Sequence, residues 1–580
     1  MSFDRDFPRG RGEADGRSAP LATARWSFTA SPWQSGHIWL GRDAIGMAVG
    51  HDDDRHAILI AGSRSGKGRS TIIPNLFLWP GSCVVIDPKG ENASVTARAR
   101  TARPGHRVAV LDPHGAADVP EELRASFNPI DLIDAVRDDA IDLAAAIGDA
   151  LMIGSNDGKD IHWNESARQV LEGILLHVAV SETGERRSLV RVRQLLTLGD
   201  PDLAASLYEG EVARLGDKAE PVTPFDALWS AMAGSSAVND AVRDVIVGAA
   251  NTIADMGENE RGSVLSTARR NTKFIDSRWM RDCLSAGTSK LDIDQLKGAP
   301  GGLSVYVCLP ARFIPTHARF LRLVLNLILY RMEAQGLAQP VCGHPVLFVL
   351  DEFAALGRLE AIEKAAGLMA GFGVKLIPVL QDLGQLKRHY KESWETFLGN
   401  AGVLQFFANA DLTTLDWLSK RMGQVELIRE TSGKSDSTTT GLSKSQSRTE
   451  SGGWSRSTST SQGQSDMAEL QRLAARDGGS GLVPFLARSG ASGVGHSTGS
   501  SDQEGQSGGE SHQLGDSSSS GSSSSTTTNE GIHLAALMTP DEIARLFDRK
   551  TGRQIVLLDG AAVALARTNY DTDEAFAKFL

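Results

Sequence analysis

Short apolar runs of strand length recur along the chain, and stretches with helical spacing separate them. Four runs lie between Ile38 and Leu111, namely IWLG, HAILIAG, GSCVVIDPKG and HRVAVLDPHG. Four more follow later: LSVYVCLP, HPVLFVLDEF, VKLIPVLQDLGQL and GVLQFFAN. Strands that alternate with helices are typical of a parallel sheet covered by helices. The pattern therefore predicts an α/β fold whose sheet begins early in the chain and is completed late.

The segment between these two groups, residues 128–275, is predicted to be all-helical. Its periodic stretches are DLIDAVRDDAIDLAAAIGDALM, NESARQVLEGILLHVAVSE and DAVRDVIVGAANTIADM, which carry apolar residues at helical spacing. The first predicted helix is acidic, with Asp131, Asp134, Asp138, Asp139 and Asp142. That face is either a solvated helix surface or a contact surface for something other than a phosphate backbone.

The composition changes to Ser, Thr and Gly over residues 431–530, as in GDSSSSGSSSSTTTNEG. Such a segment buries too little apolar surface to offset its chain entropy, so we expect it to be disordered. Inside it, MAELQRLAAR and GLVPFLA either form a short helix and strand or have only transient structure. After it, LMTPDEIARLF, QIVLLDG and AVALARTNY predict a helix and two strands that rejoin the sheet, with Thr539 as the helix cap and Pro540 at the first helical position.

The net charge and the apolar content of the chain limit the partners it can bind and indicate its cellular location. The net charge of −11 excludes a surface that is basic all over, although one basic face for nucleic acid is compatible with it. The most apolar stretch, Phe320–Tyr330, is short and contains Arg322, so we expect a buried helix and not a membrane span. The N-terminus has no signal-peptide core, and the four cysteines are too far apart to form a metal pair. The expected location is therefore the reducing cytoplasm.

The stretch AILIAGSRSGKGRSTIIPNL, residues 57–76, is the first candidate for ligand chemistry. An apolar strand leads into a turn of small residues and then into a segment that can be helical from Gly66 and Lys67 onward. Backbone N–H groups of such a turn converge where an anion is favoured, and Lys67 would reach the β- and γ-phosphates of a nucleotide. Taken alone, the stretch fits a nucleotide-binding loop and a plain Gly/Ser connection equally well.

Two positions depart from the usual phosphate-loop pattern, which has Gly where Ala61 stands and Ser or Thr where Gly68 stands. Ala61 is a mild change if it keeps a negative φ. Gly68 removes the hydroxyl that ordinarily coordinates Mg²⁺. Ser70 and Thr71 lie about one helical turn further along, where contact through water is the most they offer.

A second motif favours the nucleotide-binding interpretation. HPVLFVLDEF is an apolar strand ending in Asp351 and Glu352, which would lie at the carboxyl edge of a parallel sheet, where ligands bind. There Asp351 would hold Mg²⁺ and Glu352 would polarise the attacking water. VKLIPVLQDLGQL places Gln381 at the end of another strand, as a sensor of the γ-phosphate or as a buried polar cap.

Together these motifs resemble the TraG-type coupling ATPases of type IV secretion and conjugation systems, relatives of the FtsK/HerA DNA pumps. The resemblance covers about residues 38–430 and 536–580 and depends on SRSGKGRSTIIPNLFLWPGSCVVIDPKGEN, FNPIDLI, HWNESARQVLEGILLHV, RGSVLSTARRNTKFID, LDEFAALGRLEAIEKAAGLMAGFGVKLIPVLQDLGQL, NAGVLQFFANAD and LMTPDEIARLF. It implies a RecA-like P-loop ATPase domain with a mostly parallel sheet and an inserted all-α domain. Its members commonly carry a Ser-Gly-Lys-Gly loop, so Gly68 is a family trait.

The resemblance also implies a site for ATP and Mg²⁺ at a subunit boundary. Asp351 would hold the metal, Glu352 would activate water and Gln381 would report hydrolysis. The phosphate loop would comprise Gly62, Ser63, Arg64, Ser65, Gly66, Lys67, Gly68 and Arg69. The DPKGEN turn would add Asp87, Lys89 and Glu91 at the edge of the site.

With these motifs assigned, we expect six parts. They are a disordered N-terminal tail (1–35), a first part of the nucleotide-binding domain (36–127), an all-α domain (128–275), a second part of the nucleotide-binding domain (276–430), a low-complexity linker (431–530) and a C-terminal part of the nucleotide-binding domain (531–580).

Three features depart from the family pattern. Most members have N-terminal transmembrane helices, whereas this chain resembles a soluble variant, which would reach the inner membrane only through a partner. The stretch LMAGFG lacks the arginine that some members supply to a neighbour's nucleotide, and Arg358 and Arg388 are the candidate replacements. The Ser/Thr/Gly segment is longer than the usual linker, and its sparse, mixed charges favour a tether for a partner over a DNA-binding segment.

The resemblance, together with the features of this chain that depart from the family pattern, leads to three alternative functions. The first is an ATP-driven coupling protein, assembled as a hexamer, that recruits a DNA–relaxase complex or protein cargo and delivers it to a type IV secretion channel. The second is a cytoplasmic DNA translocase for plasmid mobilisation without a secretion role. The third is a nucleotide-binding scaffold with little hydrolysis.

Overall fold

The apolar runs form one eleven-stranded sheet in the computed structural model, which describes residues 31–152, 161–285, 287, 289–443, 517–558 and 560–580. Seven neighbouring strands run parallel, in the spatial order β9 (Ala401–Phe407), β3 (His56–Ala61), β8 (Val374–Leu380), β7 (Val346–Leu350), β4 (Cys83–Ile86), β6 (Leu303–Val307) and β5 (Arg107–Leu111). Antiparallel strands extend the sheet beyond β9, in the order β12 (Arg553–Leu558), β13 (Ala561–Ala566), β1 (Ile38–Arg42) and β2 (Ala48–His51). The predicted α/β fold with a mostly parallel sheet is confirmed, and β2 is an addition that the sequence did not predict.

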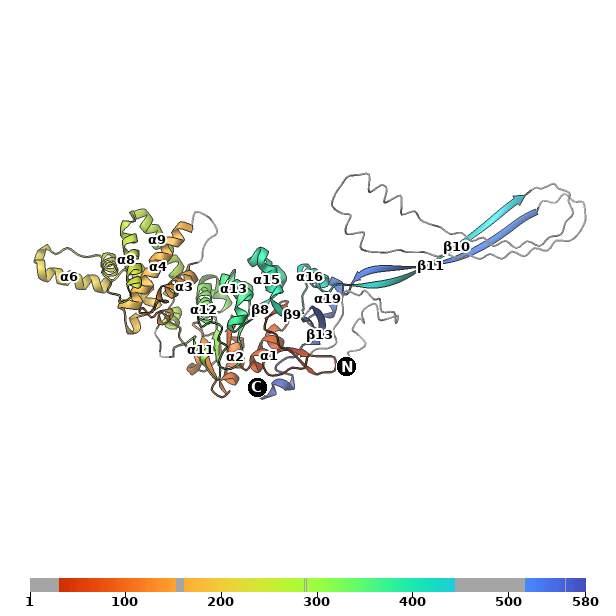
Figure 1. Ribbon diagram of the computed structural model, residues 1–580, viewed down its shortest axis with the longest axis horizontal. Helices are drawn as coiled ribbons and strands as arrows, with labels where there is room; N and C mark the ends of the chain where they lie inside the picture. Colours follow the sequence, from red (N-terminus) through yellow and green to blue (C-terminus); the bar gives the residue numbers. More distant parts are fainter. Residues whose placement is uncertain (1–30, 153–160, 286, 288, 444–516, 559) are drawn as a thin grey trace, which may run out of the picture. The chain divides into compact units, whose positions relative to one another are not determined.

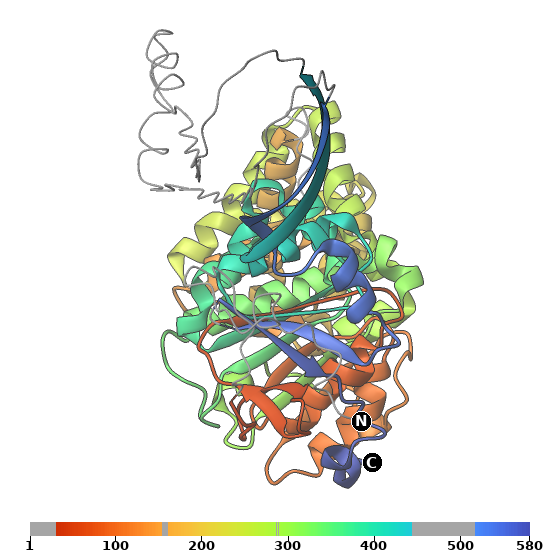
Figure 2. The ribbon, with the colours of Figure 1, turned by 90° about the vertical axis from the view of Figure 1, so that its right-hand side faces the viewer.

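The central strands are buried because helices cover both faces of the sheet (Figure 2). Every residue of β3, β4, β7 and β8 is buried, which agrees with their continuous apolar runs. On one face, Leu76 of α1 (Ile73–Leu78) and Ala97 of α2 (Glu91–Thr101) share a core with Leu59 and Val85. The predicted buried helix at 320–330 is the middle of α12 (Ile314–Ala334), whose buried residues include Phe320 and Leu327. The remaining helices that flank the sheet strands in the chain are α11 (Gln295–Gly298), α13 (Glu360–Leu368), α14 (Leu383–Tyr390), α15 (Trp394–Gly399) and α16 (Leu412–Met422).

The predicted helical insert lies between β5 and β6. Its α-helices are α3 (Ala140–Leu151), α4 (Ile161–Ser181), α5 (Leu189–Leu198), α6 (Pro201–Leu215), α7 (Pro224–Ala233), α8 (Asp240–Asp255) and α9 (Glu258–Thr272). A further helix, α10 (Arg278–Leu284), follows beyond the predicted boundary at residue 275. Helix α4 packs against α3, α8 and α9, and the four form one group in Figure 1. Buried residues such as Leu171 and Leu175 of α4 and Ile246 of α8 form its interior.

The acidic stretch at the start of the insert differs from the prediction of one continuous helix. Residues Pro129–Leu132 form a single 3-10 turn, and the α-helix begins only at Ala140. The Asp134 carboxylate accepts from the N–H of Val136 at 3.2 Å, a local bond that competes with the helical pattern. Asp131 contacts Lys290 at 3.0 Å, and Asp139 contacts Arg137 at 3.1 Å, so these aspartates do not form one uncompensated acidic helix face.

The ends of the Ser/Thr/Gly segment also differ from the expectation. Strand β10 (Gln424–Ser443) pairs with β11 (Ser517–Ala536) in a two-stranded sheet that is separate from the large one. The stretches MAELQRLAAR and GLVPFLA lie outside the described residues, as does most of the predicted N-terminal tail.

The chain returns to the sheet through α19 (Pro540–Leu546), which begins as predicted. The hydroxyl of Thr539 accepts from the N–H of Glu542, whose carboxylate accepts in turn from the N–H of Thr539, and Pro540 occupies the first turn. Among the described residues, no helix is both long and apolar enough to cross a bilayer.

A buried arginine fixes the helix that follows the phosphate loop. Arg100 in α2 has no exposed surface, and its guanidinium donates to the carbonyl oxygens of Leu76, Trp79 (3.0 Å) and Gly81 (2.7 Å) and to the Ser304 hydroxyl. These carbonyls belong to the end of α1 and the turn after it, where helical C=O groups lack partners. Arg100 therefore holds α1 against the sheet from its C-terminal end.

We expect Arg100→Met to lower the free energy of unfolding by about 3 kcal/mol, because it leaves several buried carbonyls without donors. Urea denaturation measures the change. Arg98→Met is the matched control, because Arg98 lies on the same helix but is exposed. Equal stabilities of the two variants would contradict this role of Arg100.

Candidate functional site

The carboxyl ends of three neighbouring strands bring the predicted residues together. Strand β8 lies between β3 and β7, and all three run parallel. The phosphate loop follows β3, Gln381 follows β8, and Asp351 and Glu352 follow β7. Residues far apart in the sequence thus meet at one edge of the sheet, where α/β folds bind ligands.

The four predicted catalytic side chains are in contact or near contact at this edge. Lys67 Nζ lies 3.0 Å from Glu352 Oε1 and 3.4 Å from Asp351 Oδ1. Gln381 Nε2 donates to Glu352 Oε2 at 3.1 Å. The lysine therefore neutralises two adjacent carboxylates, and the amide holds one of them in place.

The two carboxyls of this cluster have different electrostatic surroundings. Burial raises the pKa of Asp351, and the nearby Lys67 charge only partly opposes it. Burial also acts to raise the pKa of Glu352, but the Lys67 charge and the hydrogen bonds from Lys67 and Gln381 outweigh it, so the pKa is lowered. Glu352 is thus held as a carboxylate that can accept a proton once its lysine partner is drawn away.

The phosphate loop has a backbone conformation that depends on its glycines. Gly66 has φ +86°, a region that few side chains tolerate. At Gly62 an added Cβ would lie 2.0 Å from the carbonyl oxygen of Ala408, so the two backbones are too close for any larger residue. Ala61 is the last residue of β3 and has no positive φ, so its replacement of the usual Gly is accommodated.

Strain is also present in non-glycine residues of the site. Arg64 in the loop has φ +54°, and Glu352 has φ +51°. Left-handed conformations of this kind cost of order 1 kcal/mol or more and are found where the surrounding structure imposes them. The Asp351 carboxylate accepts from the Glu352 N–H at 3.0 Å, which stabilises the turn.

The hydroxyls near Gly68 have other partners. Ser70 Oγ donates to the carbonyl of Gly66 at 2.9 Å, and Thr71 Oγ1 accepts from Gln405 at 3.3 Å; both residues are buried. Neither replaces the missing hydroxyl of a strict phosphate loop. Asp351 is 6% exposed and lies beside Lys67; its predicted role as a metal ligand stays a prediction.

The residues predicted for the edge of the site have different surroundings. Asp87 follows β4, next to β7, and is fully buried; its carboxylate accepts from the N–H of Ala93 at 2.9 Å at the start of α2. Burial is the main cause that raises the pKa of Asp87 to about 7. Lys89 and Glu91 are exposed, and the Lys89 charge favours ionisation of Asp351 and Glu352.

The chain terminus contributes contacts that the sequence analysis missed. Arg567, directly after β13, donates to the carbonyl of Ser65 at 2.6 Å, and Arg69 forms a bidentate pair with Asp571 (Nε–Oδ1 2.7 Å and Nη2–Oδ2 2.7 Å). Both contacts span about 500 positions of sequence and depend on the strand order, which no local motif encodes.

The two candidate replacements for a trans-acting arginine lie outside the Lys67 cluster. Arg358 pairs with Glu363 at 3.1 Å, and Arg388 is exposed in the last turn of α14. Their role stays a prediction.

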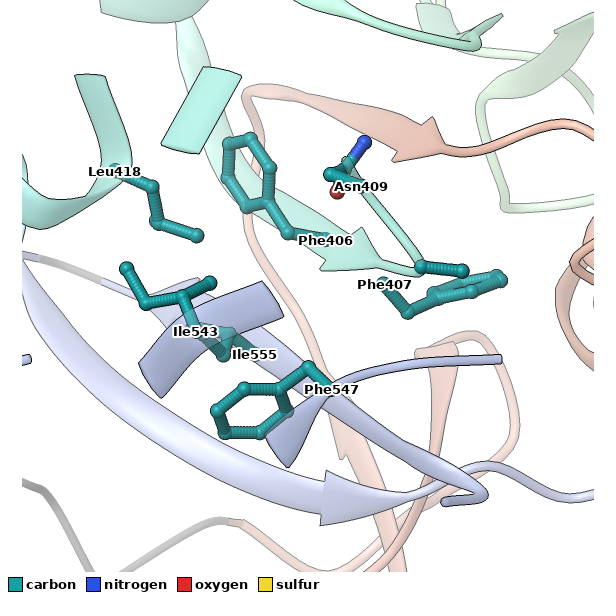
Figure 3. A pocket seen from close by; sticks show the side chains of 8 residues that line it. Phe406, Phe407, Asn409, Leu418, Ile543, Phe547 and Ile555 are labelled. Carbon is teal, nitrogen blue, oxygen red and sulfur yellow. The ribbon is translucent and has the colours of Figure 1, made fainter. Parts of the chain in front are cut away.

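A small hollow near the start of the loop has a packing role. It is lined by Phe406, Phe407, Ala408, Asn409, Leu418, Ile543, Phe547 and Ile555 (Figure 3). Asn409 is its one polar side chain and none of these residues titrates, so the hollow belongs to the contact between β9, α16, α19 and β12 and offers no chemistry.

Comparisons with known proteins bear on this site. A family model described as type IV secretory system conjugative DNA transfer matches residues 21–453. Conjugal transfer protein TraG of Escherichia coli is 27% identical over 441 residues, which cover 72% of this chain and 62% of TraG. Protein VirD4 of Rhizobium radiobacter is 26% identical over 391 residues, covering 67% of this chain and 50% of VirD4. The chain thus spans less than two thirds of the length of these relatives.

Solved structures share the fold. Bacterial conjugative coupling protein TrwBdeltaN70, in a trigonal form with sulphate, matches with a TM-score of 0.53 at 12% identity, over 95% of this chain and 96% of that chain. Plasmid coupling protein TrwB in complex with ADP and Mg²⁺ matches with a TM-score of 0.50 at 12% identity, over 94% of this chain and 91% of that chain. At such identities the likeness concerns the fold alone.

A glycine substitution in the loop tests whether its backbone forms the predicted nucleotide site. Gly62→Ala should weaken binding of a fluorescent ATP analogue at least about tenfold, because its Cβ meets the Ala408 carbonyl and displaces the loop. Gly248→Ala in α8, outside the site, is the control: an added Cβ there meets nothing within 4 Å, so affinity should stay at the wild-type value. Equal affinities of Gly62→Ala and the wild type would contradict the assignment.

The buried Asp87 predicts a pH effect on stability. Its folded-state pKa of about 7 lies above the ordinary value of 3.8, so the native protein keeps a proton that the unfolded chain loses. The resulting stability is complete below about pH 4 and is lost as the pH rises towards 7. Denaturation of wild type and Asp87→Asn at several pH values measures it: the wild type should lose up to about 4 kcal/mol relative to the variant over this range. Parallel pH curves would refute the prediction.

Proposed function

Because this chain belongs to the type IV secretory system conjugative DNA transfer family, we propose that it is an ATP-driven coupling protein. It recruits a DNA–protein complex or protein cargo and delivers it to a secretion channel. The relatives TraG and VirD4 are a conjugal transfer protein and a type IV system protein of greater length, so the activity of the whole protein is inferred from the part they share.

The observation that supports an ATPase most directly is the contact of Lys67 with the Asp351–Glu352 pair. A loop lysine and two carboxylates at the ends of neighbouring parallel strands are groups that P-loop enzymes use for phosphoryl transfer. With a nucleotide bound, Lys67 would pair with phosphate oxygens, and the two carboxylates would then be available to hold a metal ion and to orient water. TrwB, which has this fold, has been solved with ADP and Mg²⁺, in keeping with the proposal.

The donor set at this edge suits Mg²⁺. Mg²⁺ in nucleotide sites uses one or two protein carboxylates, phosphate oxygens and several waters. Asp351 supplies one carboxylate, so the missing hydroxyl at Gly68 costs one ligand that water can replace. When bound, the ion would neutralise charge on the phosphates.

Glu352 is the proposed general base and Gln381 its positioning partner. Glu352 has a lowered pKa and accepts hydrogen bonds from Lys67 and Gln381. Once Lys67 has moved to the phosphates, Glu352 accepts the proton of the attacking water, while Gln381 keeps one carboxylate oxygen oriented. Gln381 also connects β8 to the site, so a change at Glu352 reaches the sheet.

Assembly into a hexameric ring is part of the proposal. A neighbour would complete the site with an arginine, for which Arg358 and Arg388 stay the candidates. The helical insert, built on α4, α8 and α9, would meet the cargo. A DNA translocase for plasmid mobilisation is the second candidate, and it shares the same ATPase chemistry.

The decisive experiment is steady-state ATP hydrolysis with no DNA, single-stranded DNA and duplex DNA. Glu352→Gln should lower kcat at least about 100-fold, because it removes the base while keeping the shape of the side chain. Glu360→Gln, an exposed glutamate in the first turn of α13, is the control and should retain full turnover. Nucleotide binding without turnover in the wild type under every condition would favour the scaffold alternative.

A further inference from the structure

Arg567 binds the phosphate loop from the side of the last strand. Its guanidinium donates to the carbonyl oxygens of Ser65 and Arg549, both at 2.6 Å. The guanidinium carbon lies 4.6 Å from the ring centroid of Phe407, a residue of β9, next to the strand that leads into the loop. A single side chain therefore joins the loop, the C-terminal strand and the core of the sheet.

The hydrogen bond to the Ser65 carbonyl determines the direction in which the next backbone N–H group of the loop points. A trans peptide group is planar, and its C=O and N–H point in opposite directions. When Arg567 holds the Ser65 oxygen, the N–H of Gly66 must point to the other side of that peptide. Gly66 is the residue before Lys67, in the turn whose N–H groups converge on an anion.

A second contact holds the other end of the loop. The Arg69 guanidinium forms a bidentate pair with Asp571, and the Arg69 carbonyl accepts from the N–H of Tyr570 at 3.1 Å. Residues 567–571 therefore bind the loop on both sides of Lys67, at Ser65 and at Arg69. We call this segment the C-terminal clasp.

The clasp, through Thr568, and the residues that follow it, Asp573 and Phe576, are anchored to the antiparallel edge of the sheet. Trp39 Nε1 donates to Thr568 Oγ1 at 2.8 Å, and Arg42 forms a bidentate pair with Asp573 at 2.7 Å. The Phe576 ring packs edge-on against Trp39, with centroids 5.3 Å apart. The clasp thus connects β1 and β13 to a loop that belongs to the parallel half of the sheet.

We propose that Arg567 is a positioning residue for nucleotide binding, which pre-orients the peptide between Ser65 and Gly66 so that its N–H faces the phosphates. The proposal rests on the ATPase function proposed above and assigns a role to a residue outside its motifs. Pre-orientation lowers the ordering cost of binding, and it does so equally for the ground state and the transition state. Its loss should therefore raise KM and leave kcat nearly unchanged.

The chemistry of the site favours arginine over lysine at this position. The planar guanidinium reaches two carbonyls and stacks on Phe407 at once, which a point-like ammonium cannot do. Among the described residues, Arg567 Nε and Ser65 Oγ are buried polar atoms without a hydrogen-bond partner. Both belong to the residues that form the contact between clasp and loop, so the hydrogen bonds of this contact are not fully satisfied.

The test compares Arg567→Gln and Arg567→Lys with the wild type in the 580-residue chain. Steady-state ATP hydrolysis gives KM and kcat, titration with a fluorescent ATP analogue gives Kd, and thermal unfolding gives Tm. For Arg567→Gln we expect KM and Kd to rise about tenfold while kcat changes less than about twofold. Arg567→Lys should recover part of the affinity, because it can still donate to the Ser65 carbonyl. Lys550→Gln removes an exposed cation in the turn before β12. It is the control for loss of one positive charge and should match the wild type.

The outcomes separate this inference from the proposed function. If the wild type binds no nucleotide, the proposed function fails and this inference fails with it. If the wild type binds and Arg567→Gln binds equally well, only the role of Arg567 is overturned. A lower Tm with unchanged Kd means a purely structural arginine and also overturns it. If Arg567→Gln does not fold, Asp571→Asn tests the clasp from its other contact: a rise in Kd supports the proposal, and an unchanged Kd overturns it.

Discussion

The contact between Lys67 and the two carboxylates of Asp351 and Glu352 is the interaction on which the site depends. It exists because β3, β8 and β7 are parallel neighbours, so that the loop, the acidic pair and Gln381 leave the sheet at one edge. Two carboxylates side by side repel each other, and the lysine at 3.0 and 3.4 Å offsets that repulsion in the nucleotide-free state. The same charges are those that a nucleotide and its metal would engage.

Two arginines that donate to backbone carbonyls, the buried Arg100 and the partly buried Arg567, support this edge of the sheet. Arg100 holds the end of α1, and Arg567 holds the loop that precedes α1. Partial burial lowers the pKa of Arg567. In both cases the guanidinium gives partners to C=O groups that neither helix nor sheet can satisfy. The C-terminal clasp therefore holds the loop at Ser65 and at Arg69, and Arg100 holds the end of the helix that follows it.

The sequence predicted the parts of the fold whose physical requirement has a local signature. Continuous apolar runs marked the buried strands, Thr539 and Pro540 marked a helix start, and the glycines and Lys67 marked the loop. The acidic stretch before Ala140 was wrongly predicted to be helical. The spacing of apolar residues does not reveal that a side chain such as Asp134 accepts a hydrogen bond from a nearby backbone N–H group. The strands at 424–443 and 517–536 were missed because Ser and Thr give no apolar alternation.

The sequence identified the motif residues of the site, but it did not identify the side chains that contact them or how deeply they are buried. Lys67, Asp351, Glu352 and Gln381 were found because each follows a recognisable strand. Arg567 and Asp571 were not, because their proximity to the loop follows from the order of strands β13, β12, β9 and β3 in the sheet. The burial of Asp87 likewise depends on β4 being next to β7.

The central claim is that this lysine–carboxylate cluster is a nucleotide site, and a structure determined with a non-hydrolysable ATP analogue and Mg²⁺ tests it most directly. The account predicts that Lys67 Nζ leaves Glu352 for the phosphate oxygens, that Asp351 faces the metal and that Glu352 stays bound to Gln381. A nucleotide bound elsewhere, or a Lys67 still paired with Glu352 beside the bound analogue, would contradict it.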